Sequence, residues 1–401
     1  MQYFSDYEWL GISIANHYGL DKKTFKERVQ WFRENHRNLE PLIETCDPDS
    51  APLFIKGVIE VNRILAGEKT PAMTYLDAIC SGIQILSVLT RCPSGCKATG
   101  AINMDTDIRP NAYLAVQREM ESILGESVEV SYKDIKDAVM TSCYGSKKVP
   151  KDLFGEGPVL QAFEEACKRV APGAFNLLPV LRGTWNPETY AHTWTLPDGH
   201  VVYTPVMTEE HVKLEIAELG NYKMSTMIYD NQPKLRGLAN IANVTHSLDA
   251  YILRNVVRYC NYDKQQLEDI LYATEKLMCT VRPETSKEYE EVKKLNYLDF
   301  HSITTMHLEV QPMEVLMLVK QKVMWVLAYE PFEVLTVHDC FVVNATNSRR
   351  LKEVYNLIIA EMSESRILDD ILSQLYGKPV ELQVFPESIY DDVLENDYAI
   401  C

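Results

Sequence analysis

Two apolar, β-rich runs flank a single dipeptide near the end of the sequence. Residues 333–338 and 340–344 are rich in Val, Leu, Thr and Phe, with His338-Asp339 at their junction. So short a connection predicts a tight β-hairpin. The hairpin would present Asp339 at its tip, near a residue of another strand, where a solvated surface charge is not expected. An ordinary turn aspartate is the alternative interpretation.

The rest of the chain mixes helical and β patterns. Apolar residues recur with a helical period in some segments, whereas others alternate or end in turn signals such as Pro197-Asp198-Gly199 and Gly220-Asn221. This mixture favours the α+β class. We expect helices over residues 24–45, 54–65, 81–90, 128–146 and most of 246–330, and short strands over residues 72–77 and 193–230.

Composition excludes some functions. The 401 residues carry 40 basic and 57 acidic side chains, a formal charge of −17. This charge argues against a protein that binds nucleic acid or anionic membrane over its whole surface. A local basic groove is still compatible with it. The N-terminus lacks a signal peptide's basic start and apolar core, and residues 78–90 are too short to span a bilayer. Ten scattered cysteines predict a reducing cytoplasm, and Cys92 and Cys96 flank an expected turn rather than a zinc site.

An aspartate also ends the strand expected at residues 72–77. Asp77 is followed by Ala78-Ile-Cys-Ser-Gly82-Ile-Gln84, a small-residue turn into a helix. Such a turn leaves the Asp77 carboxylate and nearby backbone carbonyls exposed, and hard oxygen ligands suit Mg²⁺. The alternative is a helix N-cap.

A third stretch carries basic and aromatic residues on one helical face. Lys136, Met140 and Tyr144 recur every four residues, with Lys133 one turn earlier. Two lysines and an aromatic ring on one helix can hold a polyphosphate and stack on a base. A solvated charged face is the alternative.

Together the three stretches resemble the motifs of the phage-type single-subunit RNA polymerases, the family that includes mitochondrial RNA polymerase. Motif A, D-x-x-C-S-G-I-Q, matches residues 77–84; motif B, K-x-x-x-M-T-x-x-Y-G-S, matches residues 136–146; and motif C, H-D, matches His338-Asp339. Similarity continues in the segment before motif A, in His246-Ser-Leu-Asp249 and in the terminal L-E-N-D-Y-A-I-C.

The resemblance implies template-directed ribonucleotidyl transfer with two Mg²⁺ ions. The ions would be held by the carboxylates of Asp77 and Asp339 and the carbonyl of Ala78. Two carboxylates about 5 Å apart repel by roughly 3 kcal/mol at an effective dielectric near 20, which divalent cations relieve. Lys136 is expected to neutralise phosphate charge. Lys22 has the same role by resemblance, with a plain surface lysine as its alternative.

The substrate sugar is expected to be ribose. Family A DNA polymerases share the three motifs but place a glutamate five residues after the motif A aspartate, where Gly82 stands here. The glycine leaves space for a 2′-hydroxyl, and the Tyr144 hydroxyl can bond to it. By resemblance, His246 lies near the same hydroxyl and Tyr113 lies in the substrate pocket. A family A-like DNA polymerase remains the closest rival.

The sequence departs from the family pattern in ways that predict a partner. The first motif B cation is replaced by Tyr132, so Lys133 is its expected substitute, and Asp137 stands where the family has arginine. The chain lacks the D-x-x-G-R motif, the thumb and the promoter-binding N-terminal domain. It therefore resembles the larger subunit of the two-chain polymerases of Enquatrovirus-type podoviruses. We expect an obligate heterodimer in the infected host cytoplasm, acting on DNA template, nascent RNA and NTPs, with a possible recruitment factor.

The resemblance also predicts a domain organisation. Residues 212–229 occupy the position of the family's promoter-reading hairpin, and residues 261–315 form an additional helical, charged insertion. A catalytically idle polymerase-like module that binds DNA is the alternative from another functional class. The expected parts are a helical module (1–67), a palm with motif A (68–94), fingers with motif B (95–245) and a palm with motif C ending in a C-terminal foot (246–401).

Overall fold

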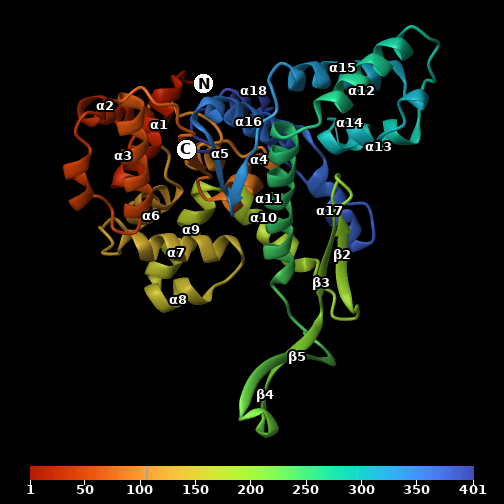
Figure 1. Cartoon of the computed structure of the whole chain (residues 1–401). Helices are drawn as coiled ribbons and strands as arrows, with labels where there is room; N and C mark the ends of the chain where they lie inside the picture. The colour runs from red at the N-terminus through yellow and green to blue at the C-terminus, as the bar shows by residue number, and fades with distance from the viewer. Residues whose placement is uncertain (105–106, 296) are drawn as a thin grey trace.

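A three-stranded antiparallel sheet joins the two aspartate-bearing stretches. The computed structural model describes residues 1–104, 107–295 and 297–401, and their side chains except those of 209–211, 229–231 and 294. The strands β1 (Met73–Asp77), β6 (Leu335–Val337) and β7 (Cys340–Asn344) lie in the order β1-β7-β6 (Figure 1). Val337 pairs with Cys340, so His338-Asp339 forms a two-residue turn. The predicted strand and hairpin are confirmed, as is the α+β class.

Three helices form the core next to this sheet. The helices α4 (Ser81–Leu89), α11 (Ala239–Cys260) and α16 (Ser348–Glu364) pack against one another, and α16 also contacts β7. Gln84 on α4 is fully buried and receives a hydrogen bond from the Tyr355 hydroxyl of α16 at 2.7 Å. This polar contact fixes α4, which directly follows motif A, on α16.

The C-terminal segment pairs with the strand that carries Asp77. The Cys401 N–H donates to the Asp77 carbonyl at 2.9 Å, and Ala78 forms a β-bridge with Ile400. The buried Lys352 of α16 donates to the carbonyls of Asp397 and Ile400 at 2.7 and 2.8 Å. The C-terminal segment, held by Lys352, thus supports the strand that carries Asp77.

The N-terminal region is a separate group of helices beside β1. Thr24 and Glu27 form a capping box at the start of α2, and Pro41 prevents the helix predicted over 24–45 from continuing. That prediction was therefore wrong after Asn35, where a turn and a short 3₁₀ segment replace the helix. The elements are α1 (Asp6–Ala15), η1 (Asn16–Leu20), α2 (Phe25–Asn35), η2 (Glu40–Glu44) and α3 (Ala51–Leu65).

The segment between α4 and the second sheet is helical. Pro93 starts a short helix where we expected only a turn, because proline is well suited to a first helical turn. The helix predicted over 128–146 is shorter: Ser131 caps its start, and Gly145, at φ +81°, follows its end. The helices are α5 (Pro93–Ala98), α6 (Ala112–Leu124), α7 (Tyr132–Cys143), α8 (Lys148–Phe154), α9 (Pro158–Val170) and α10 (Pro172–Gly183).

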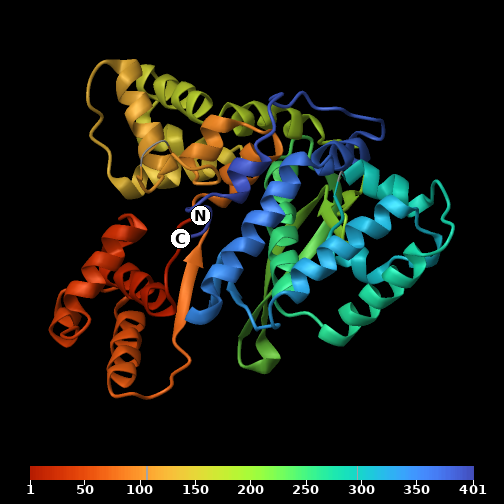
Figure 2. The same cartoon turned by 90° about the horizontal axis from the view of Figure 1, so that it is seen from above.

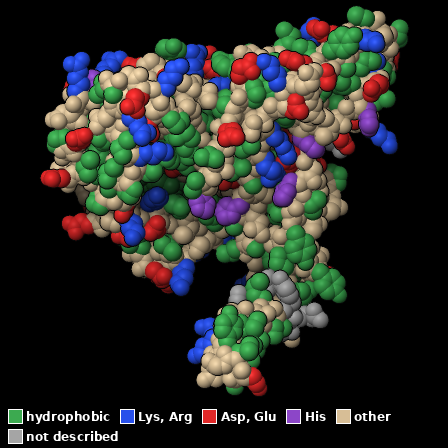
Figure 3. All heavy atoms as spheres, in the orientation of Figure 1, with side chains coloured by type: hydrophobic (Ala, Val, Ile, Leu, Met, Phe, Trp, Pro, Cys, Tyr) green, Lys and Arg blue, Asp and Glu red, His purple; other side chains and the backbone are tan. Residues whose placement is uncertain are grey.

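Two further antiparallel pairs confirm the strands expected over 193–230. The strands β2 (Ala191–Thr195) and β3 (Val201–Pro205) are joined by the turn that contains Gly199. The strands β4 (Met207–Ile216) and β5 (Tyr222–Pro233) form a long ribbon that projects from the body (Figures 1 and 3), with η3 (Ala217–Leu219) and Gly220-Asn221 at its tip.

The ribbon has two different faces because side chains alternate along each strand. In this register Lys213, Glu215 and Lys223 lie on one face, where Lys223 and Glu215 approach to 3.7 Å. The opposite face is apolar, and hydrophobic side chains on the ribbon are visible in Figure 3. That face carries Val212, Leu214, Ile216, Tyr222, Met224 and Ile228.

The predicted insertion is helical and lies at the opposite end of the molecule from α1–α3 (Figures 1 and 2). Its long helix α12 packs against α15, which begins where the insertion ends. No helix in the described part of the chain is long and apolar enough to cross a membrane. The elements from here onward are α12 (Lys264–Met278), α13 (Lys287–Leu295), α14 (Phe300–Thr305), η4 (Leu308–Val310), α15 (Met313–Leu327), η5 (Ala345–Asn347), α17 (Ile367–Tyr376) and α18 (Tyr390–Leu394).

Candidate active site

The sheet brings the two predicted catalytic aspartates to one edge. Asp77 lies opposite Cys340, and Asp339 is the residue immediately before it. His338 has φ +56°, a conformation that is strained for a residue with a side chain and that turns the chain within two residues. The aspartates, far apart in sequence, are therefore neighbours across β1 and β7.

Electrostatic coupling between the carboxylates follows from this arrangement. Solvent reaches part of Asp77, yet the surrounding protein desolvates it. Burial and the Asp339 carboxylate raise the pKa of Asp77 from 3.8 to about 6, against the opposing charge of Lys136. The Ala78 N–H also donates to the Asp77 carboxylate. Because the folded chain holds the mutually repelling carboxylates of Asp77 and Asp339 near each other, this position is suited to binding a cation.

Asp249 is a third carboxylate at this site, and the sequence argument did not include it among the functional residues. Burial raises its pKa to about 6, and the charges of Asp339 and Asp77 add to that effect. Asp249 follows His246 by three positions on α11, so both lie on one face of the helix. The His-Ser-Leu-Asp segment was the available signal.

The donor set limits which metal could bind. Within residues 1–104, 107–295 and 297–401, no three His, Cys, Asp or Glu side chains are arranged to hold a metal ion. Mg²⁺ often takes only one or two protein carboxylates and completes its shell with water and substrate phosphates. Asp77 and Asp339 fit that requirement. Whether the Ala78 carbonyl takes part stays a prediction.

Gly82, Tyr144 and His246 come together from three elements. A Cβ added at Gly82 would lie 3.2 Å from both the Tyr144 hydroxyl oxygen and the Cys143 sulfur. The Tyr144 and His246 rings lie 4.9 Å apart, centroid to centroid. Because residue 82 is a glycine, Tyr144 can lie close to α4. The predicted role of both residues in ribose selection requires this close approach.

A row of alternating lysines and tyrosines leads away from motif A. The Lys136 ammonium is 6.0 Å from the centroid of the Tyr113 ring, Tyr113 and Tyr132 lie 6.1 Å apart, and Lys22 is 5.4 Å from the Tyr132 ring. Tyr113 also hydrogen-bonds to the Cys80 thiol. Lys22, which additionally pairs with Asp21, thus joins this row from the N-terminal helices.

The structure does not bring Lys133 into this row. Lys133 is exposed on α7, and none of the ring contacts among the described side chains includes it. Arg109 is a basic residue that sequence reasoning missed. Its positive charge lowers the pKa of Asp77, and its buried Nε has no hydrogen-bond partner among the described residues. Arg109 lies in the loop before α6, where no periodic spacing of residues marks it as a functional residue.

Comparison with known proteins agrees with the motif resemblance. Residues 5–153 match the family described as DNA-dependent RNA polymerase, a stretch that contains Asp77, Lys136 and Tyr144 but ends before Asp339. Two relatives come from bacteriophages. T7 RNA polymerase of Escherichia phage T7 is 32% identical over 114 residues, covering 25% of this chain and 12% of the relative. A DNA-directed RNA polymerase of Enterobacteria phage K11 is 30% identical over 347 residues, covering 63% and 38%.

The chain is therefore similar, over part of its length, to DNA-dependent RNA polymerases of bacteriophages. The chain spans only 12% and 38% of the two relatives. The activity of a whole polymerase is therefore a matter for proposal.

Proposed function

We propose that this chain is the catalytic part of a DNA-dependent RNA polymerase. In the proposed reaction the 3′-hydroxyl of the nascent RNA attacks the α-phosphate of an incoming NTP, and pyrophosphate leaves. The observation that carries the proposal is the meeting of Asp77, at the end of β1, with Asp339, in the turn before β7, near Lys136 of α7 and Tyr144 at its end.

Asp77 and Asp339 are proposed to hold two Mg²⁺ ions together with the Ala78 carbonyl. When bound, Mg²⁺ would lower the pKa of the attacking hydroxyl and stabilise the charge on the phosphates. The raised pKa of Asp77 supports this role, because cation binding relieves the repulsion that raises it. Asp249 adds negative potential and is proposed to position the ions rather than ligate them.

Lys136 is proposed to neutralise the triphosphate as charge develops. Its electrostatic effect on Asp77 supports a position near the phosphates. Lys22 and Arg109 supply further positive charge on the same side, and Arg109 replaces the cation that motif B lacks at Asp137. Lys133 remains a predicted substrate contact, which no ring contact described above supports.

Ribose selection is assigned to Gly82, Tyr144 and His246. The close approach of Tyr144 to Gly82 supports a pocket in which the tyrosine hydroxyl meets the sugar 2′-oxygen. Tyr113 would form the adjoining wall, since its ring faces Lys136. A glutamate in place of Gly82 would fill this space, which distinguishes the site from that of a family A-like DNA polymerase.

The chain is proposed to act with a second, smaller subunit in the cytoplasm of an infected bacterium. That subunit would supply the N-terminal part that retains template and nascent RNA, and a recruitment factor could join them. The palm-and-fingers domain boundaries belong to the same proposal. The ribbon at residues 212–229 is proposed to read the promoter.

The test is primed RNA extension on a DNA template with NTPs and Mg²⁺. We compare the chain alone, the chain with a candidate second subunit, and Asp77→Asn with that subunit. Extension that needs the subunit and disappears in the variant is the expected result. Extension by the chain alone to the same level overturns the heterodimer, preference for dNTPs favours a DNA polymerase, and no extension under any pairing favours an idle module.

A further inference from the structure

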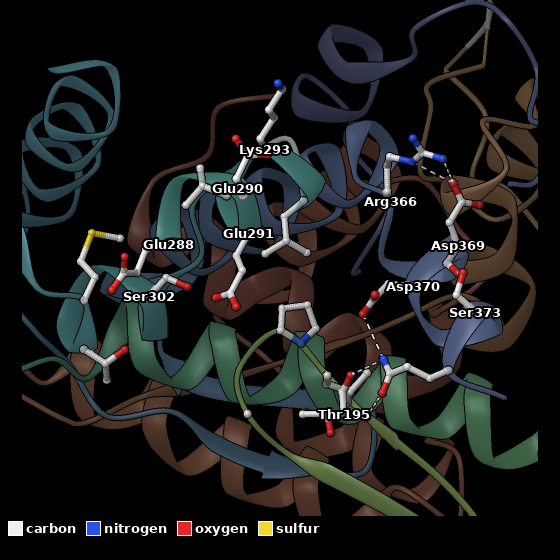
Figure 4. Close-up of a pocket in the computed structure, with 18 of the residues that line it drawn as sticks. Thr195, Glu288, Glu290, Glu291, Lys293, Ser302, Arg366, Asp369, Asp370 and Ser373 are labelled. Atoms are coloured by element: carbon white, nitrogen blue, oxygen red, sulfur yellow. Dashed lines mark hydrogen bonds and ion pairs between the residues drawn. The ribbon is translucent and has the colours of Figure 1, made fainter. Parts of the chain in front are cut away.

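A large groove lies outside the candidate active site. It has a volume of about 860 Å³ and is bounded by α13, the end of α14, the β2–β3 turn and α17 (Figure 4). No active-site residue described above lines it. One wall belongs to the helical insertion, for which the proposed polymerase activity gives no role. The volume is near the upper end of the range for ligand sites, and is sufficient for a short peptide segment.

The walls of the groove are held in place by polar contacts. The buried Asp198 of the β2–β3 turn receives hydrogen bonds from Arg254 at 2.6 Å and Arg258 at 3.0 Å, both on α11. Thr195 exchanges two hydrogen bonds with Gln374 of α17, at 2.8 and 3.1 Å. A preformed groove of this kind loses little conformational entropy when it binds.

The groove is acidic. Glu288, Glu290, Glu291, Asp369 and Asp370 line it, against Lys293 and Arg366. Neither cation offers its charge to a ligand in the cavity. Arg366 forms ion pairs with Asp369 at 3.0 Å and with Glu381 at 3.3 Å. Lys293 points away from the cavity in Figure 4.

Several of the carboxylates keep their charge available for a ligand. Glu291 points into the groove in Figure 4. Among the side chains that the structure describes, neither Glu288 nor Glu291 forms an ion pair, and Asp370 accepts a hydrogen bond only from the neutral Gln374 amide. Uncompensated negative charge on two walls of the groove, α13 and α17, attracts cations and repels nucleic-acid phosphates.

Apolar side chains line the same groove. They come from the β2–β3 turn, from α13 and from the segments that follow α14 and α17, so apolar and acidic groups share one lining. Lysine and arginine side chains match such a surface, because their methylene stems cover apolar area while their charged heads reach carboxylates. The apolar lining includes Leu196, Pro197, Val292, Met306 and Val380.

We propose that this groove binds a segment of another protein rich in lysine and arginine. The charge pattern favours that partner over nucleic acid. The inference gives the insertion a function in assembly and does not depend on catalysis by this chain.

The test measures binding of a fluorescein-labelled octapeptide of alternating lysine and alanine by fluorescence anisotropy at about 0.15 M salt. The groove variant is Glu288→Gln/Glu291→Gln/Asp370→Asn, which removes charge but keeps hydrogen-bonding groups. The matched control is Glu268→Gln/Glu284→Gln/Glu387→Gln, three exposed carboxylates outside the groove. We expect the groove variant to weaken binding about tenfold and the control to change it less than about threefold.

Equal weakening by both variants overturns the proposal, because it would reflect the net charge of −17 rather than the groove. Equal binding of a glutamate–alanine octapeptide also overturns it. So does tight binding of a DNA duplex that is lost in the groove variant alone. Circular dichroism melting of both triple variants confirms that they remain folded, and primed extension should be unchanged in each.

Discussion

Two hairpins of the molecule, β6–β7 and β4–β5, differ in almost every physical respect. The β6–β7 hairpin turns within two residues, and β7 is paired on both sides, by β6 and β1. The β4–β5 ribbon has strands of 10 and 12 residues, a wider turn and, among the described residues, no third strand. A group on the short hairpin is held by the sheet, whereas a group on the ribbon can change without disturbing the core. Under the proposed function, the rigid hairpin would serve chemistry and the projecting ribbon would serve recognition.

The largest expected effect comes from the tip of the short hairpin. Asp339→Asn should reduce primed extension at least about 10³-fold with the fold intact, because a positioned charge at a reacting centre is lost. Extension is measured under single-turnover conditions with saturating NTP. Glu218→Gln, at the ribbon tip, is the matched control and should leave the rate unchanged. Similar losses in both variants would remove the distinction between the hairpins.

Adding a methyl group at Gly82 should reduce activity less than Asp339→Asn does. It should still reduce activity more than truncating a larger side chain on the ribbon. Gly82→Ala places a Cβ 3.2 Å from the Tyr144 hydroxyl, so the tyrosine must shift. We expect kcat/KM for NTPs to fall about 10- to 100-fold, and discrimination against dNTPs to fall as well.

Two controls accompany this variant. Gly157→Ala adds a methyl where no atom lies within 4 Å, and Met224→Ala truncates an exposed ribbon side chain. Both should keep kcat/KM within about threefold of the wild type. If Gly82→Ala behaves like them, Tyr144 has room to adapt and the proposed ribose pocket is wrong.

The clustered carboxylates predict an unusual dependence of stability on pH. The pKa of Asp249 is about 6 in the folded chain against 3.8 when unperturbed, so the folded state binds more protons between those values. Metal-free protein should therefore lose stability as pH rises from about 4 through about 6. Asp249→Asn removes the repulsion and should increase the free energy of unfolding at pH 7.5 by about 1–2 kcal/mol.

Urea unfolding in EDTA at pH 4 and pH 7.5 measures this effect. The advantage of Asp249→Asn should disappear at pH 4, where the Asp249 carboxyl of the folded wild-type protein is protonated and as uncharged as the asparagine amide. Glu218→Gln on the ribbon should show no pH-dependent difference. A destabilised Asp249→Asn at pH 7.5 would mean that its carboxylate makes net favourable contacts.

The smallest effect on chemistry is expected from removing the ribbon. Replacing residues 212–229 with an Asn-Gly turn should keep primed extension within about threefold, since the ribbon pairs with no other strand in the described part of the chain. Initiation-site choice on promoter DNA, mapped by the 5′ ends of transcripts, should change. Loss of primed extension to the level of Asp339→Asn would assign the ribbon a structural role.

Much of the candidate active site could be predicted because its signals are local. The strand before Asp77, the tight turn at His338-Asp339 and the helix that carries Lys136 and leads to Tyr144 each follow from short-range patterns, and the structure contains all three. The helix over residues 24–45 was predicted too long because its apolar period continues past Asn35, where α2 ends.

The missed residues depend on packing between distant segments. Asp249 reaches the other carboxylates only because α11 packs against α4 and α16. Arg109 approaches Asp77 from a loop whose path no periodic pattern records. The acidic groove likewise exists only where the insertion meets α17 and the β2–β3 turn. Tertiary placement of this kind lies beyond what spacing in one sequence can indicate.

The pairing of Asp77 with Cys401 has a consequence for how the protein is made. A ribosome releases β1 early, but the residues that pair with it, in β7 and at position 401, are synthesised far later. During that interval the strand has exposed edges, and contacts so distant in sequence form slowly. The nascent chain should therefore gain its N-terminal helices first, and the strand that ends in Asp77 should become fully paired only after residue 401 has been synthesised.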